Sequence, residues 1–312
     1  MESPVGCLRC CNAGGSPGET GRAEGEEMES FDQSLKYLLE HEPEDFIRFG
    51  LNGEPLEALR PVESALPSRG RDVDGSYLFT SRGVQRLAHI EFHRRHQGQD
   101  ELSIDVAEAQ IRLFRRERVE VVSFVWDLYG RVGDPVLSRC VLVFGEQSQS
   151  QYRRINLRGM SARELLAQGP PALWPLLPLT SDGATGEAVQ AARDAIEGRG
   201  ELSAVRRADH LAVLWFIAEA ENVAVDLLRA YIQKEKLMQS ELYRSIFAEG
   251  QQEGLQQGLQ QGLQQAIMDL CEILGIELTP ERTAQIEQLD PAQLSQLRTY
   301  LKSARAWPLA RP

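Results

Sequence analysis

Two neighbouring runs of the chain alternate between apolar and polar side chains. They are DVDGSYLFT (72–80) and VQRLAHIEFH (84–93), and a period of two predicts β-strands. Only the tripeptide SRG (81–83) separates them, so we predict a β-hairpin. Farther along, VLSRCVLVF (136–144) is apolar enough to predict a strand buried on both faces, and YRRIN (152–156) predicts a weaker fourth strand.

Elsewhere the apolar residues recur at the spacing of three and four that is typical of amphipathic helices. The first such pattern begins at Ser30, where Ser-Phe-Asp-Gln matches a capping box, and Pro43 is expected to divide it into two short helices. Connections rich in proline or glycine are predicted over 50–70 and 170–183. The remaining helical patterns cover 103–129, 187–248 and 281–304.

The order strand, strand, helix, strand predicts an α/β fold, with a mixed sheet flanked by helices and followed by an all-helical C-terminal region. Residues 1–27 are rich in Gly, Glu and Ser and lack an apolar period, which predicts a disordered tail. The expected organisation after this tail is a sheet-containing core over 28–180, a helical region over 181–248, and a Gly/Gln-repeat helix with C-terminal helices over 249–312.

The repeat EGQQEGLQQGLQQGLQQA (249–266) places a glycine every four residues, from Gly250 to Gly262, with leucines beside them. On a helix, this spacing forms a smooth glycine stripe next to a leucine stripe. Each interior glycine costs about 0.8–1 kcal/mol of helix stability relative to alanine. Two interpretations remain open: a stripe that lets another helix approach closely, for example in a homodimer, or a weak and largely solvated helix.

Composition excludes several classes of protein. The longest apolar run, LAVLWFIA (211–218), is too short to cross a bilayer, and no secretory signal is visible, so we expect a cytoplasmic location and no membrane contact. The five cysteines are odd in number, and Cys7-x-x-Cys10 lacks a second ligand pair for zinc. The net charge of −12 argues against coating nucleic acid by bulk electrostatics. We find no P-loop, nucleophile elbow or dinucleotide fingerprint.

The hairpin carries an unusual set of polar residues. If Arg82-Gly83 is the turn, then Asp74 lies opposite Glu91, and Asp72 lies opposite His93. A four-residue loop would instead place Asp72 opposite Glu91 and Asp74 opposite His89. Both registers leave Asp72, Asp74, Glu91 and His93 on one face of the sheet.

Carboxylates that face each other across a sheet destabilise it, because like charges lie about 4.5–5.5 Å apart at Cβ. A divalent cation would relieve the repulsion, and Mg²⁺ needs only one or two carboxylates besides water and substrate phosphates. His93 could then orient water or donate a proton. The other interpretation of the same spacing is an exposed sheet face with scattered acids and imidazoles.

These residues resemble the PD-(D/E)xK nuclease pattern, in which an acid on one strand is followed by Glu-x-Lys on the next. RDVDGSYLF and LAHIEFHRR are similar to the branch of recombination-promoting nucleases and transposases, which usually has Glu-x-Gln where this chain has Glu91-Phe92-His93. FDQSLKYLLEHEPEDFIRF, VSFVWDLYGRVGDPVLSRCVLVF, PALWPLLPLTSDG and the repeat tail resemble the same branch, so the resemblance covers residues 30–312.

The resemblance implies a restriction-endonuclease-like core and Mg²⁺- or Mn²⁺-dependent cleavage of DNA. It assigns Asp74 and Glu91 as metal ligands and places His93 at the Lys/Gln position, where it supplies no fixed charge. Asp72 competes for the role of Asp74. Asp32 and Lys36 match the acid and the lysine of the opening helix.

The main hypothesis is therefore a metal-dependent DNA endonuclease that acts in recombination or transposition. The alternative is a catalytically inactive nuclease-fold protein that binds DNA or protein partners through its helical tail. The best candidates for DNA contact are four arginines near the acids, although the glutamates interleaved with the helical pair also fit an ordinary solvated face. They are Arg94, Arg95, Arg112 and Arg115.

Overall fold

The computed structural model describes residues 20–62, 73–93, 99–144 and 148–308. The chain divides into two compact units, Met1–Arg244 and Ser245–Pro312. The larger unit holds the sheet and the smaller one is helical, and each is described by itself below.

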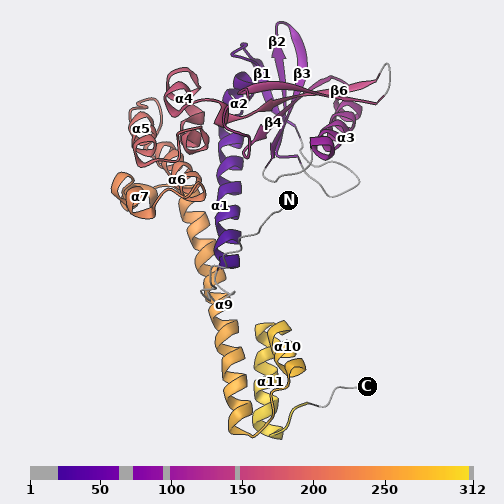
Figure 1. Ribbon diagram of the computed structural model, residues 1–312, viewed down its shortest axis with the longest axis vertical. Helices are drawn as coiled ribbons and strands as arrows, with labels where there is room; N and C mark the ends of the chain where they lie inside the picture. The colour runs from indigo at the N-terminus through magenta and orange to yellow at the C-terminus, as the bar shows by residue number, and fades with distance from the viewer. Residues whose placement is uncertain (1–19, 63–72, 94–98, 145–147, 309–312) are drawn as a thin grey trace, which may run out of the picture. The chain divides into compact units, whose positions relative to one another are not determined.

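Six strands form one mixed sheet in the larger unit (Figure 1), which confirms the α/β class. Their order across the sheet is β1-β2-β3-β4-β6-β5. The pairs β3–β4 and β4–β6 are parallel, and the other three pairs are antiparallel. The strands are β1 (Glu57–Pro61), β2 (Gly75–Ser81), β3 (Val84–His93), β4 (Glu120–Asp127), β5 (Leu137–Val143) and β6 (Gln149–Ile155).

The predicted hairpin is present, and its turn is Arg82-Gly83. Gly75 pairs with Ile90 and Ser81 pairs with Val84, so paired residue numbers sum to 165. Both turn residues have positive φ, 51° for Arg82 and 74° for Gly83. Two-residue hairpin loops favour such turns because their twist matches that of the strands. The two-residue register is thus confirmed, and the four-residue loop is excluded.

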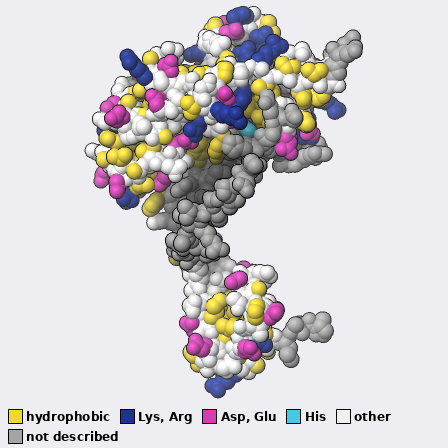
Figure 2. All heavy atoms as spheres, in the orientation of Figure 1, with side chains coloured by type: hydrophobic (Ala, Val, Ile, Leu, Met, Phe, Trp, Pro, Cys, Tyr) yellow, Lys and Arg dark blue, Asp and Glu magenta, His cyan; other side chains and the backbone are white. Residues whose placement is uncertain are grey.

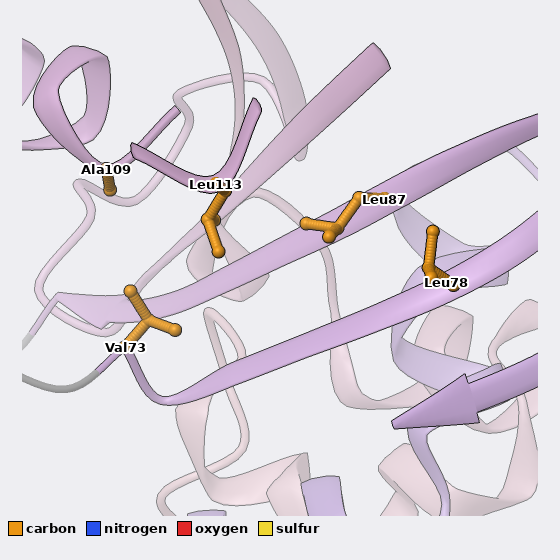
Figure 3. Close-up of a cluster of buried hydrophobic side chains, with 5 residues drawn as sticks. All are labelled: Val73, Leu78, Leu87, Ala109 and Leu113. Atoms are coloured by element: carbon orange, nitrogen blue, oxygen red, sulfur yellow. The ribbon is translucent and has the colours of Figure 1, made fainter. Parts of the chain in front are cut away.

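Helices pack on both faces of the sheet. Helix α3 (Gln99–Glu117) contributes Ala109 and Leu113 to a buried cluster on one face; Figure 3 shows them with Val73, Leu78 and Leu87 from the hairpin. On the opposite face, α1 (Thr20–His41) and α2 (Pro43–Gly50) meet at Pro43, as predicted. The Phe46 ring of α2 lies edge-on to Trp126, with ring centroids 4.9 Å apart.

The prediction of one helix over 103–129 is wrong in its second half. Helix α3 ends at Glu117, Arg118 adopts a left-handed φ of 58°, and β4 begins at Glu120. The sequence of β4, EVVSFVWD, is rich in β-branched and aromatic residues, which favour strands. Its apolar residues occur so often that the helical spacing fits them as well, because a central strand has to be apolar on both faces.

Three further features differ from the prediction: an additional strand, the exposure of β5 and the start of α1. Strand β1 lies within the predicted connection 50–70. Strand β5 is an edge strand whose side chains are half-buried or exposed, instead of a strand buried on both faces. Helix α1 already begins at Thr20, so Ser30 lies inside it and its carbonyl accepts a hydrogen bond from Ser34 Oγ at 2.7 Å. The rest of the tail predicted to be disordered, residues 1–19, lies outside the described residues.

Helical elements follow the sheet, as predicted. The proline-rich connection forms the 3₁₀ element η2 (Pro171–Leu179), of which seven residues are buried. The others are η1 (Leu157–Gly159), α4 (Ala162–Gln168), α5 (Gly186–Glu197), α6 (Ala204–Ala220), α7 (Val225–Tyr231) and α8 (Lys234–Leu237). Of the described helices, none combines the length and hydropathy needed to span a bilayer.

The smaller unit is a helical hairpin built on the end of α9 (Glu241–Ile273), with α10 (Pro280–Gln288) and α11 (Pro291–Ala304) beside it (Figure 1). The helical region predicted over 281–304 is split because Asp290 caps α11 in a capping box with Gln293. The glycine repeat is helical, and a Cβ added at Gly250, Gly254, Gly258 or Gly262 would meet nothing within 4 Å. The core of the unit contains Ile267, Cys271, Ile286, Leu294 and Leu301.

Candidate metal and phosphodiester site

The hairpin brings the predicted acids to one face of the sheet. Gly75 pairs with Ile90, so the same register places the preceding residue, Asp74, opposite Glu91. Side chains alternate along a strand, and Asp74, Glu91 and His93 therefore share the face on which α3 packs. Asp74 lies just before β2, and its Oδ2 accepts a hydrogen bond from the backbone N–H of Phe92 at 2.7 Å.

The carboxyl group of Asp74 is in an unfavourable place for a negative charge. Burial and the nearby charge of Glu91 raise its pKa from 3.8 to about 6, although the Phe92 N–H, Lys36 and His89 act in the opposite direction. Removal from water disfavours the charged form of an acid, and a second carboxylate does the same. The two acids thus repel each other, as expected from the register.

Glu91 is held by His89. Its Oε1 lies 2.9 Å from His89 Nε2. The histidine is 1% exposed, whereas the Glu91 side chain is 30% exposed. Glu91 therefore combines a buried hydrogen-bond partner with access to solvent.

His93 lies beside Asp127, an acid that the sequence patterns did not indicate as a site residue. Its Nδ1 is 3.8 Å from Oδ1 of Asp127, the last residue of β4. Arg154 Nε donates to Asp127 Oδ2 at 2.6 Å, and the backbone N–H of Tyr129 donates to Oδ1 at 3.0 Å. Burial would raise the pKa of Asp127, but its contacts with His93 and Arg154 outweigh this and hold the pKa below its usual value.

Asp127 and Arg154 lie within stretches quoted above for other reasons, WDLYG and YRRIN. An acid that ends an apolar run was the available signal, because strand ends carry polar side chains to the edge of a sheet. The helical pattern predicted over 103–129 hides this signal, because it places Asp127 within a helix.

The opening helix contributes charge to the same end of the sheet. Lys36 Nζ lies 3.0 Å from Asp32 Oδ2, one helical turn away. The positive charge of Lys36 is among the influences that lower the pKa of Asp74. The structure thus brings Lys36 within electrostatic range of Asp74, and Asp32 comes with it.

The predicted DNA contacts are less well supported. Arg112 forms an ion pair with Glu108 on α3, and Arg115 is exposed. On the face drawn in Figure 2, Lys and Arg side chains of the larger unit lie in separate groups among apolar and acidic ones. Arg94, Arg95 and Asp72 lie outside the described residues.

The donor set at the hairpin fits a hard divalent cation only in the form that Mg²⁺ uses. Within the described residues, no group of three or more His, Cys, Asp or Glu side chains is placed to hold a metal ion. The site offers two carboxylates that repel each other, and one of them, Glu91, is accessible to solvent. Two carboxylates are enough for Mg²⁺, which keeps several waters and takes one or two carboxylates. Asp74 and Glu91 are the residues that would hold it.

The comparisons with known proteins do not add to this description. No family model, no curated protein and no solved structure matches the chain. What can be inferred about function therefore depends on the residues of this chain.

Proposed function

We propose that the protein is a metal-dependent DNA endonuclease with a restriction-endonuclease-like core, and that it cleaves phosphodiester bonds at the hairpin face. The observation that carries the proposal is that Asp74, one residue before the paired strand, lies opposite Glu91, where burial and the second carboxylate raise the pKa of Asp74 to about 6. Folding gains nothing from two repelling acids, so a ligand of opposite charge explains them best. The resemblance to the Asp…Glu-x-Lys pattern agrees with this choice.

Each residue of the site has a role in this proposal. Asp74 and Glu91 would hold the cation, and a bound cation would supply an activated water and positive charge beside the phosphate. His93, beside Asp127, orients the attacking water or returns a proton to the leaving oxygen.

Arg154 is a fixed cation near His93, and its charge is paired with the Asp127 carboxylate through Nε and Nη2. It pairs across the sheet with Val125, which in turn pairs with Glu91. Arg154 therefore lies on the same face as the acids, two strands from Glu91. An arginine remains protonated throughout the physiological pH range, so Arg154 keeps its positive charge beside Asp127 whether or not His93 is charged.

The direct test is cleavage of supercoiled plasmid and of single-stranded DNA in Mg²⁺ or Mn²⁺, over a range of salt and pH. Glu91→Gln should abolish cleavage and leave the circular dichroism spectrum unchanged. Glu187→Gln, an exposed glutamate in the first turn of α5, is the matched control and should cleave like the wild type. Cleavage that persists in Glu91→Gln would remove this site from the proposal.

One observation favours the inactive alternative. An oxygen of Asp74 is already engaged by the Phe92 N–H, which extends the hydrogen bonding of the strand and is a structural task. If Asp74 has only this structural role, the protein would bind DNA or a protein partner without hydrolysis, and divalent cations would leave its melting temperature unchanged. A ligand that prefers the folded state must raise it, so a thermal-shift titration with Mg²⁺ and Mn²⁺ distinguishes the two proposals.

A further inference from the structure

A chain of buried and partly buried hydrogen bonds lies between the sheet and α3 and ends at Glu91. It begins at Ser150 in β6, whose Oγ is 2.6 Å from Gln110 Oε1 on α3. Gln110 Nε2 is 2.9 Å from Ser123 Oγ in β4, and Ser123 Oγ is 2.9 Å from His89 Nδ1. We refer to Ser150, Gln110, Ser123 and His89 as the polar relay. Ser123 and His89 are each 1% exposed.

The direction of the relay is fixed by a backbone carbonyl. Gln110 Nε2 also lies 2.7 Å from the carbonyl oxygen of Gln151. A carbonyl oxygen can only accept, so the Gln110 atom facing it must be the amide nitrogen. The second amide hydrogen then points to Ser123 Oγ, and the amide oxygen accepts from the Ser150 hydroxyl.

Ser123 connects the Gln110 amide with the His89 ring. Its hydroxyl accepts from Gln110 and has one hydrogen of its own to donate. Among the described residues, the other partner of this hydroxyl is His89 Nδ1. An ionised carboxylate only accepts, so Nε2 carries a hydrogen and donates to Glu91 Oε1 at 2.9 Å. In the neutral ring, Nδ1 then carries the lone pair and accepts from the Ser123 hydroxyl.

We propose that His89 is a positioning residue, which the polar relay holds as the Nε2–H tautomer so that it fixes the Glu91 carboxylate for a divalent cation. The inference rests on the proposed function, because the cation belongs to that function. Both ring nitrogens of His89 are engaged, so the histidine does not bind the metal itself. It occupies Oε1 and leaves Oε2 of the half-exposed Glu91 for the ion.

This arrangement has a known physical effect. A partner that donates a hydrogen bond to a ligating side chain fixes its orientation, and loss of such a partner typically weakens metal binding about 10–100-fold. The relay reaches from β6 through α3 and β4 to β3, so the orientation of Glu91 depends on how these elements pack. A solvated glutamate would lose side-chain freedom on binding the ion, and Glu91 has lost part of it already.

The first measurement is independent of activity and of metal. Long-range ¹H–¹⁵N correlation spectra of the full chain, with ¹⁵N-labelled histidine, report the tautomer of each ring, and the signals missing from His89→Gln assign His89. We expect the Nε2–H tautomer in the wild type. Ser123→Ala should alter the His89 signals, and Ser34→Ala, which removes a buried hydroxyl from α1, should not. An Nδ1–H tautomer in the wild type would overturn the proposal.

The second measurement is Mn²⁺ affinity, followed by electron paramagnetic resonance of the free ion. His89→Leu removes the donor to Glu91 and should weaken binding about 10–100-fold. His89→Gln, whose amide nitrogen can take the place of Nε2, should stay within about threefold and guards against a folding defect in the leucine variant. Equal affinity of His89→Leu and wild type would overturn the positioning role alone. A wild type that binds no Mn²⁺ would overturn the proposed function and the role of the cation together, whatever the tautomer.

Discussion

Replacement of Asp74 by asparagine should stabilise the metal-free protein above about pH 6. The asparagine Oδ1 can still accept the Phe92 N–H, but the buried charge beside Glu91 is gone. A change of one in pKa corresponds to about 1.4 kcal/mol. The rise in the pKa of Asp74 from 3.8 to about 6 therefore sets an upper limit of about 3 kcal/mol on the stability that the variant can gain. The side chain keeps some access to water, and we therefore expect a gain of about 1–3 kcal/mol.

The pH dependence has a definite sign. Folded Asp74 holds its proton up to a higher pH than unfolded Asp74, so the wild type loses stability as the pH rises from 3.8 to about 6. The advantage of Asp74→Asn should be absent below this window and complete above it. Urea denaturation with a chelator present, at several pH values between about 4 and 8, measures the free energy of unfolding of both proteins.

Asp127→Asn is the matched control, because Asp127 is also an acid on this face but has a lowered pKa. It should lose about 1.5–3 kcal/mol, the value of hydrogen bonds to a charged group, instead of gaining stability. With Mg²⁺ the order for Asp74 should reverse, because the wild type gains a ligand that the variant binds poorly. An Asp74→Asn variant that is less stable than the wild type at pH 7 without metal would refute the reasoning about the buried charge.

Three further predictions concern other parts of the chain. The buried carboxylate of Asp209 accepts hydrogen bonds from Tyr37, Ser240 and the backbone N–H of Glu241. Asp209→Ala removes this acceptor, so it should lower the free energy of unfolding by about 3 kcal/mol in urea denaturation. Gly254→Ala should stabilise α9 by about 0.8–1 kcal/mol in thermal unfolding, since the added methyl meets nothing within 4 Å; a loss of stability would indicate a close partner at the glycine stripe. If the glycine stripe forms a homodimer, a chain ending at Ala248 should sediment as a monomer, and an unchanged oligomeric state would discard that interface.

The hairpin was predictable because it depends on local chemistry alone. A period of two fixes the faces, and a two-residue turn ending in glycine fixes the register. Together they predict that Asp74 and Glu91 share one face of the sheet in either of the two open registers, and the two-residue turn of the structure selects the register in which they lie opposite each other. The division of the first helical pattern at Pro43 was predictable for the same reason, since a proline lacks the N–H that a continuous helix needs.

Strand β4 is not predictable in this way, and the residues that it brings to the site are therefore not predictable either. A strand with neighbours on both edges and helices on both faces is apolar throughout, so its pattern does not differ from that of a buried helix. A helix over 103–129 gives Ser123 and Asp127 no place beside the hairpin. Their pairing with His89 and His93 is set by the parallel register of β3 and β4, which joins residues 34 positions apart.

The space between the sheet and α3 holds both an apolar cluster and the polar relay, and the presence of the relay argues for a function at its end. Near the turn, Leu78 and Leu87 pack against Leu113, an arrangement that stabilises by apolar burial alone. Beside this apolar cluster, the polar relay connects His89 of the hairpin with Ser123 of β4, Gln110 of α3 and Ser150 of β6, and it stabilises only because each of its polar groups has a partner. A core under selection for stability alone would have continued the apolar packing, since well-packed apolar residues usually equal or exceed buried polar groups. The polar relay instead ends at Glu91, which lies opposite Asp74, so the relay and the acids are best understood as parts of one site.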